Sequence, residues 1–413
     1  MGLDKEVINL KRFIDIYIPT EICNLRCDYC YVAQHGEASG QVGKICHSPE
    51  EIRKAISQER LGGVALLNIC GGGETLLGEE ILPIIKALLE EGHYVSVITN
   101  GTLSSKFQEM AQWDTELLSR LFFKFSFHYL ELKKKGLLDT YFSNIKVMRD
   151  HGASFTVELM PYDDLEPYIE DIKTITLEKL GAYPHLTVGR DDTSSELKLL
   201  SQNTETEYYN IWKTFQSSMF EFKMKQWGKE QTEYCYAGEY SLSLRLDTGD
   251  LYQCNGLVKL DNVYNNSDAC LHLRAVGKRC PHAHCWNCHA YFALGVVPEV
   301  EAPEYSTLRD RVCKDGSHWL QQGVIELFSQ KLYNNNRQYS KEEILRAENL
   351  NLQEEIDTLA KKMLEYKKWN DDLQTQVNDR LDELSEYKEW VHNLQETIEW
   401  KNKEIDDLKK LIE

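Results

Sequence analysis

The 413-residue chain is short of positive charge: 47 lysines and arginines stand against 66 aspartates and glutamates, a formal net charge of −19. Phosphate backbones are bound by basic surfaces, so this deficit argues against nucleic acid as the main partner. The chain also lacks an uninterrupted apolar run long enough for a membrane span. Its first residues, 1–11, are charged and do not have the pattern of a secretion signal, so we expect a cytoplasmic protein.

Cysteine, by contrast, is plentiful, with 12 residues. In a reducing compartment this number favours metal binding over disulfides. Cys23, Cys27 and Cys30 have the spacing Cys-x3-Cys-x2-Cys. Three thiolates on one short loop can hold a cubane iron–sulfur cluster and leave its fourth iron open for chemistry, because the full complement is four cysteines. A zinc knuckle is the alternative, with His35 as the nearest fourth ligand.

Short apolar runs alternate with helical patterns up to about residue 192, which predicts a parallel α/β sheet. We expect strands at 13–18, 64–69, 94–99, 122–127, 154–160 and 185–188, and helices at 49–60, 78–91, 104–113, 141–151 and 165–179. Ser48 and Pro49 read as the N-cap and first residue of the first of these helices. A further helix, at 201–232, is expected to bridge to a cysteine-rich segment.

With Tyr29 just before its third cysteine, the first motif resembles that of the radical S-adenosylmethionine (SAM) enzymes. The resemblance implies a partial (βα)6 barrel over residues 1–200. It also implies a 4Fe–4S cluster on Cys23, Cys27 and Cys30, with SAM bound to the open iron. Active sites of βα barrels lie at the carboxyl ends of the strands, which is where the cysteine loop follows the first strand.

The same resemblance assigns SAM-binding residues after the following strands. Gly72, Gly73 and Glu74 match the family's Gly-Gly-Glu element, in which the glutamate is expected to hold the methionyl amine. Asn100 lies in a Thr-Asn-Gly segment that is common in the family, and Ser126 is positioned like a residue that contacts the SAM ribose or carboxylate. Tyr29 is expected beside the adenine.

A second set of cysteines follows at Cys235, Cys254, Cys285 and Cys288, with Gly249 in a hairpin turn five residues before Cys254. This pattern resembles the auxiliary-cluster domains called twitch and SPASM, and implies such a domain over residues 233–330. We expect one auxiliary 4Fe–4S cluster on these four thiols, with Cys280 as the alternative ligand. A zinc ribbon on the same thiols remains open, because tetrahedral thiolate sites suit both metals.

The segment 340–413 carries an unbroken heptad pattern, which predicts a parallel two-stranded coiled coil and hence a homodimer. Its a positions are Ile356, Met363, Asn370, Val377, Leu384, Val391, Ile398, Ile405 and Ile412, and its d positions are Leu352, Leu359, Tyr366, Leu373, Arg380, Tyr387, Leu394, Lys401 and Leu408. Asn370 is expected to fix the register, and the rod is roughly 90 Å long. A helix pair that folds back on its own domain is the alternative.

Taken together, the resemblance implies an oxidoreductase that reductively cleaves SAM to a 5′-deoxyadenosyl radical, takes a hydrogen atom from its substrate and passes an electron to the auxiliary cluster. We expect flavodoxin or ferredoxin as electron donor and alcohol dehydrogenation of a sugar or glycan precursor as the reaction. His128, Glu158 and Arg190 are the candidates for the catalytic base. Two alternatives remain: radical modification of a ribosomally made peptide, and a coiled-coil scaffold with a vestigial barrel.

Overall fold

The computed structural model describes residues 8–34, 40–193, 196–266, 269–278 and 280–412, which form two compact units, 1–347 and 348–413. The first unit is built on a nine-stranded sheet with the order β11-β10-β9-β1-β2-β3-β4-β5-β6. These strands are β1 (Leu10–Ile18), β2 (Val64–Gly71), β3 (Tyr94–Thr99), β4 (Leu121–Ser126), β5 (Ser154–Leu159), β6 (His185–Leu186), β9 (Ser241–Arg245), β10 (Asp250–Tyr252) and β11 (Lys259–Asn262). A separate pair joins β7 (Arg190–Asp191) to β8 (Lys198–Leu199).

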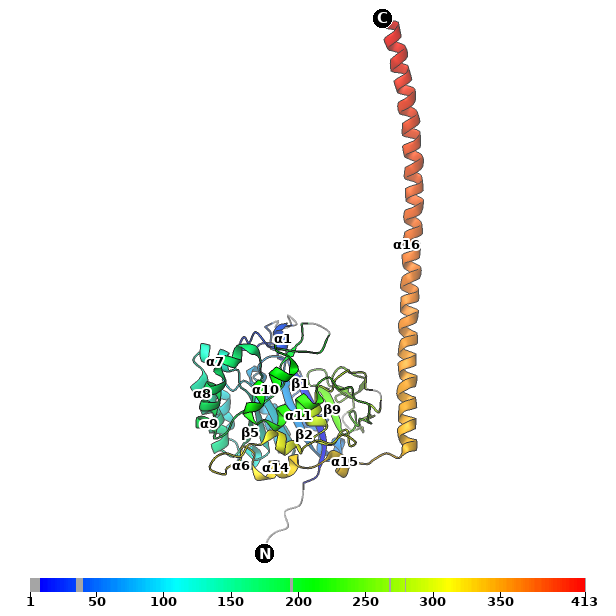
Figure 1. Ribbon diagram of the computed structural model, residues 1–413. Coiled ribbons are helices and arrows are strands. Elements are labelled where there is room, and N and C mark those ends of the chain that lie inside the picture. The colour runs from blue at the N-terminus through cyan, green and yellow to red at the C-terminus, as the bar shows by residue number, and fades with distance from the viewer. Residues whose placement is uncertain (1–7, 35–39, 194–195, 267–268, 279, 413) are drawn as a thin grey trace. The chain divides into compact units, whose positions relative to one another are not determined.

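Strands β1 to β6 pair in parallel and in sequence order, as the alternating pattern predicts (Figure 1). The helices between them are α1 (Tyr31–Gln34), α2 (Pro49–Ala55), α3 (Gln58–Leu61), α4 (Ile81–Glu90), α5 (Ser104–Met110), α6 (Thr115–Leu118), α7 (Tyr129–Lys134), α8 (Leu138–Asp150) and α9 (Ile169–Leu180), with 3-10 turns η1 (Thr75–Leu77) and η2 (Asp163–Tyr168). Ser48 caps α2 as expected, because its hydroxyl accepts from the amide of Glu51 at 3.3 Å.

Two expected helices are each broken into two. The stretch 49–60 breaks because Ser57 caps a new helix, α3, by accepting from the amide of Arg60. The stretch 201–232 holds α10 (Glu205–Trp212), a 3-10 turn η3 (Lys213–Phe215) and α11 (Ser218–Gln226). Here Gln216 adopts the left-handed conformation with φ 51°, and Ser217 caps the next helix. A polar composition alone did not reveal these internal caps.

Strand β9 adds a join that the sequence did not predict. It pairs in parallel with β1, so the hairpin β9–β10 extends the main sheet. The hairpin turn itself is as predicted, with Gly249 at a φ of 78°. The rest of the first unit contains α12 (Cys288–Tyr291), α13 (Tyr305–Arg309), α14 (Gln322–Phe328) and α15 (Leu332–Asn335).

The two faces of the parallel sheet differ in character. Ile14, Ile16, Leu67 and similar side chains pack against α2 to α9 in one apolar core. On the other face, residues near the start of the strands, such as Phe13 and Phe122, pack against α11 to α15 in a second core. Between that second core and the carboxyl ends of the strands, this face carries polar side chains, all buried except Glu158: Asp15, Asn68, Ser96, Lys124, Thr156 and Glu158.

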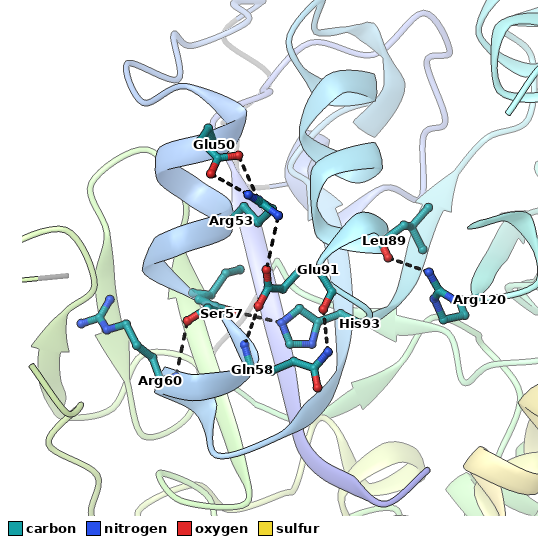
Figure 2. Close-up of polar contacts among 10 residues, drawn as sticks. Glu50, Arg53, Ser57, Gln58, Arg60, Leu89, Glu91, His93 and Arg120 are labelled. Atoms are coloured by element: carbon teal, nitrogen blue, oxygen red, sulfur yellow. Dashed lines mark hydrogen bonds and ion pairs between the residues drawn. The ribbon is translucent and has the colours of Figure 1, made fainter. Parts of the chain in front are cut away.

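At the amino-terminal end of the strands, the buried side chain of His93 links the segment after α2 to the start of β2 (Figure 2). Its Nε2 lies 2.9 Å from the carbonyl oxygen of Ile56, and its Nδ1 accepts from the amide of Ala65 at 3.1 Å. Beside it, Gln58 of α3 bonds to Glu91 at the end of α4. These contacts anchor α2, α3 and α4 to the start of β2 and leave the opposite end of the strands free for the cysteine loop.

The second unit is part of one uninterrupted helix, α16 (Lys341–Ile412), of 72 residues. The predicted alternative of a helix pair folding back requires a turn, and none interrupts this helix. Most side chains at its described a and d positions are exposed; Ile356, for example, is 56% exposed and Val391 46%.

Candidate radical site at the carboxyl end of the sheet

The loop after β1 carries the first three cysteines and is held by its own backbone. The amide of Cys30 bonds to the carbonyl oxygen of Cys27 at 3.1 Å, and the amide of Leu25 bonds to Cys23 Sγ at 3.4 Å. Burial, with a smaller contribution from the neighbouring thiols of Cys23 and Cys30, raises the pKa of Cys27 to about 12. The loop therefore gathers all three thiols in one neighbourhood. His35, the fourth ligand of the zinc alternative, lies outside the described residues.

As placed, no three Cys, His, Asp or Glu side chains in the described parts of the chain meet as a ready-formed metal site. The donor set itself still suits an iron–sulfur cube, because three thiols lie on one short loop and none of the described residues closes the set as a fourth ligand. A cluster would be held by Cys23, Cys27 and Cys30. Burial raises the pKa of Cys23 and of Cys27, so cluster binding would have to displace the protons of these two thiols.

An amide network ties this loop to the segment after β3. Asn100 Nδ2 donates to Asn24 Oδ1 at 2.7 Å and lies 3.6 Å from Cys23 Sγ. Asn24 Nδ2 in turn donates to the Thr102 hydroxyl at 2.7 Å, and that hydroxyl donates back to Asn100 Oδ1 at 2.6 Å. Asn100 thus contacts the cysteine loop directly, and its predicted role in binding SAM stays a prediction.

The Gly-Gly-Glu segment after β2 supports the loop by its backbone. The amide of Gly73 donates to the carbonyl oxygen of Thr20 at 2.7 Å, and that of Glu74 to Ile22 at 2.9 Å. A Cβ on Gly73 would lie 1.9 Å from the Ile22 oxygen, so only glycine allows this approach. At Gly72 the nearest atom would be the Thr20 oxygen at 3.5 Å, an ordinary contact. Position 73 therefore requires glycine, whereas position 72 has room for a Cβ atom.

Glu74 has partners that its motif did not suggest. It is 2% exposed, and its carboxylate accepts from the Thr99 hydroxyl at 2.6 Å and from the amide of Asn100 at 2.7 Å. Burial raises its pKa, and these hydrogen bonds oppose the rise. The side chain thus links the ends of β2 and β3, while its proposed hydrogen bond to the SAM amine remains untested.

Tyr29, within the cysteine loop, stands between two residues of later strand ends. Its ring lies 4.4 Å from that of Tyr162, measured between centroids, and its hydroxyl is 2.5 Å from His128 Nδ1. Burial lowers the pKa of His128 to about 4, so the imidazole is neutral at physiological pH. An open cavity of about 640 Å³ lies beside Tyr29 and Tyr162, and Asp28 and Trp227 also line it. It offers a route to the loop.

The other two predicted bases, Glu158 and Arg190, each have a charged partner. Arg309, which is fully buried, donates to the partly exposed carboxylate of Glu158 in an ion pair. Burial raises the pKa of Glu158, but Arg309, Lys124 and Lys223 together bring it below its usual value, so this carboxylate is ionised. Arg190 pairs with Asp192, and its guanidinium lies 4.1 Å from the centre of the Trp286 ring.

The second set of cysteines is also brought together. Cys235, Cys254, Cys280 and Cys288 all lie close enough to Cys285 to raise its pKa, after burial as the main cause. A cavity of about 60 Å³ is lined by Cys235, Cys254, Cys280 and Cys285. The structure therefore groups the four predicted ligands and the alternative, Cys280. Cys313 lies elsewhere, with its thiol 3.2 Å from the carbonyl oxygen of Leu180.

The two thiols that flank the β9–β10 hairpin lie outside its strands. Cys254 follows β10, but Cys235 precedes β9 and pairs by its backbone with Gly277. The four-thiol donor set suits an iron–sulfur cube and zinc alike. An auxiliary cluster therefore fits these residues and remains a proposal.

Asp15 of β1 connects the second cysteine group to the parallel sheet, and the sequence analysis did not identify it. Asn287, between Cys285 and Cys288, donates to one oxygen of Asp15 at 2.8 Å, and Asn68 of β2 donates to the other at 2.7 Å. The second cysteine group is thereby fixed against the polar face of the sheet. The available signal was a charged residue in the middle of an apolar strand, which Asp15 shares with Lys124.

Comparisons with known proteins agree with this geometry. Residues 17–174 match the model of the Radical SAM superfamily. A nucleotide dehydratase of Fibrobacter sp. (strain UWH6), described as S-adenosylmethionine-dependent, is 31% identical over 104 residues, which cover 23% of this chain and 29% of that protein. The 7-carboxy-7-deazaguanine synthase of Aquifex aeolicus (strain VF5) is 31% identical over 88 residues, 21% of this chain and 36% of that protein. The matches thus span well under two thirds of both curated relatives.

Among solved structures, SuiB of Streptococcus suis bound to S-adenosylmethionine aligns with a TM-score of 0.40 and 14% identity over 63% of each chain. The structure of anSMEcpe with bound AdoMet aligns with a TM-score of 0.42 and 15% identity over 62% of this chain and 79% of that one. The family match identifies a radical SAM domain in this chain. Within the described residues, no helix has the length and apolarity to cross a membrane.

Proposed function

We propose that this protein is a radical SAM oxidoreductase that oxidises an alcohol of a sugar or glycan precursor to a carbonyl group. The observation that carries the proposal is the hydrogen bond from Asn287 to Asp15, which fixes the second cysteine group against the polar face of the sheet. A net two-electron oxidation needs an electron acceptor beside the substrate. A second cluster at Cys235, Cys254, Cys285 and Cys288 would stand at that face.

When bound, SAM and a cluster on the first loop would supply the radical that takes a hydrogen atom, and the second cluster would accept the remaining electron. The chain's own residues orient and protect the substrate. Glu158 is our choice as acceptor of the hydroxyl proton, because it is ionised and, among the described residues, only its Oε1 accepts a hydrogen bond. Tyr29 and His128 hold the cysteine loop against the ends of β4 and β5.

We further propose that two copies pair through α16. The apolar residues at the described a and d positions form an exposed row along the single helix. In a coiled coil, each such side chain packs into a hole between residues of the facing helix, so a second helix would cover this row. Flavodoxin or ferredoxin would serve as the external electron donor.

The test begins with metal content after anaerobic reconstitution with iron and sulfide. We expect about eight irons per chain, which is two cubes, and about four after changing Cys285 and Cys288 to Ala. That variant should still form 5′-deoxyadenosine from SAM but should make no ketone from a panel of sugar precursors. Changing Cys23, Cys27 and Cys30 to Ala should instead abolish 5′-deoxyadenosine formation. Cys313→Ala, outside both groups, is the control.

Two results would contradict the proposal. Retention of zinc at the second site after this procedure would make that site structural. Full 5′-deoxyadenosine formation by the triple variant of the first loop would mean that a cluster on Cys23, Cys27 and Cys30 is not the site of SAM cleavage.

A further inference from the structure

Several buried polar atoms on the polar face of the sheet have no hydrogen-bond partner. Thr156 is fully buried, and its hydroxyl is unpartnered. Arg309, also fully buried, uses Nη1 for Glu158, and its guanidinium lies 4.9 Å from the centre of the Tyr305 ring. Its Nε and Nη2 have no hydrogen-bond partner among the described residues. His289 Nδ1 is likewise buried and unpartnered. Such groups are costly to leave unsatisfied, and every one of them can donate a hydrogen bond to an acceptor.

Lys124 lies beside Thr156 on the same face of the sheet. It is 6% exposed, and its ammonium forms no hydrogen bond or ion pair with any described residue. It lies directly opposite Thr156 in the β4–β5 register, so the two side chains leave the sheet side by side on the same face. Charged neighbours, Glu158 and Asp15, lie near this largely buried lysine, but neither accepts a hydrogen bond from it. Burying a cation without a hydrogen-bonded counter-ion is expensive in free energy.

Two further cations share the space. Lys124, Lys223 and Arg309 all act electrostatically on Glu158 and on His289, so the three form one group, which we call the cationic cluster. Glu158 offsets one of the three charges. Asp15 lies near Lys124, but burial raises its pKa, and Asn68 and Asn287 already satisfy its oxygens. Lys223 also faces the Cys288 thiol, so a cluster there would balance part of its charge.

We propose that the cationic cluster, with the Thr156 hydroxyl, binds an anionic group of the substrate, either a carboxylate or a phosphate. Lys124 and Arg309 are its main partners, because they retain unused donors. The proposal deepens the function proposed above and rests on it for the statement that the ligand is the substrate.

The site also fixes the direction in which such a substrate would lie. Ser126 is two residues beyond Lys124 on the same face of β4, about 7 Å closer to the carboxyl end of the strand. A substrate anchored at Lys124 therefore extends past Ser126 and Glu158 toward the cysteine loop. The sugar oxidised would carry its acidic group on the side away from the first three cysteines.

The experiment measures ligand binding rather than turnover, so that it stands apart from a failure of the proposed reaction. The full-length reconstituted protein is titrated with inorganic phosphate, glucuronate and glucose at constant ionic strength, and the unfolding midpoint is followed. We expect phosphate or glucuronate to raise the midpoint and glucose to leave it unchanged. Whichever anion acts identifies the chemistry of the substrate group.

Variants decide whether the cationic cluster is responsible. Lys124→Met should weaken anion binding by about tenfold or more, because it removes a charged hydrogen bond. Without anion it should raise the unfolding midpoint, because an unpaired buried charge is gone. Thr156→Val should weaken binding less, without loss of stability. Lys146→Met, at an exposed position of α8, is the control.

The opposite results overturn the proposal. If neither anion stabilises the protein more than glucose does, no anion site exists there. If Lys124→Met binds as the native chain does, the site lies elsewhere. If Lys124→Met unfolds or melts at a lower temperature, the lysine is a structural counter-charge for Asp15 and Glu158. Anion binding that persists while no ketone forms would contradict the proposed reaction but not the anion site.

Discussion

Replacing Gly73 with alanine should displace the cysteine loop without unfolding the protein. The added Cβ would lie 1.9 Å from the oxygen of Ile22, 2.3 Å from its carbonyl carbon and 2.8 Å from its nitrogen. All three are backbone atoms, so the overlap cannot be relieved by turning a side chain. The loop has to move, and it gives up the bonds from Gly73 to Thr20 and from Glu74 to Ile22.

Two backbone hydrogen bonds are worth about 2 kcal/mol together, which corresponds to a change of about 30-fold in the ratio of seated to displaced loop. That is well below the roughly 5–15 kcal/mol stability of a typical protein, so the sheet should persist. Because Cys23 follows Ile22 directly, a displaced loop should bind a cluster more weakly. The measurement is iron per chain after anaerobic reconstitution, with circular dichroism to verify folding.

Gly72→Ala is a closely matched control. Its Cβ would meet only the Thr20 oxygen, at 3.5 Å, so iron binding should stay at the native level. A Gly73→Ala protein that loads iron as well as the native chain would refute the reasoning. Equal losses in both variants would refute it too, because they would mean that the segment is sensitive to any side chain and not to this close approach.

Three more predictions follow from other parts of the chain. Removal of residues 341–413 should turn a dimer into a monomer in light scattering and leave the iron content unchanged; a truncated protein that stays dimeric would exclude α16 as the dimerisation element. Asn370→Ile should raise the melting temperature of the isolated rod and relax its preference for two strands, as seen by sedimentation equilibrium. Burial lowers the pKa of His93 below its unfolded value of about 6.5, so its contribution to stability should be complete above that pH and decline as the pH falls toward the lowered folded pKa. Urea unfolding at several pH values measures how steeply the free energy of unfolding changes with pH, which gives the number of protons taken up on unfolding. In His93→Gln this number should be smaller by up to one, and an unchanged dependence on pH would contradict the prediction.

Local patterns in the sequence predicted the strands well, because the apolar runs that form β1 to β5 are short and bounded by clear turns. The expected strand at 94–99 coincides with β3, and the others end within a few residues of the observed limits. Spacing likewise grouped the two sets of cysteines. Internal caps were harder to find: Ser57 and Ser217 each begin a new helix inside a segment whose composition stays helical.

The polar contacts of the site could not be predicted in the same way, because they join distant parts of the chain. Asp15 meets Asn287 across 272 residues, and Glu158 meets Arg309 across 151. Nothing in the local pattern of either partner indicates the other. Only the join of β9 to β1 brings the second cysteine group to the face where Asp15 points.

The distribution of charge inside the sheet bears on what the site can do. A sheet that needed only stability would fill this face with apolar side chains, as Phe13 and Phe122 do one layer away. Instead Lys124 and Arg309 are buried there beside the ionised carboxylate of Glu158, and Arg309 keeps two unused donors. Buried charges without partners destabilise a fold, so their presence is understandable if a ligand satisfies them. The same reasoning explains why stability and binding should move in opposite directions when Lys124 is neutralised, a combination that a purely structural lysine cannot produce.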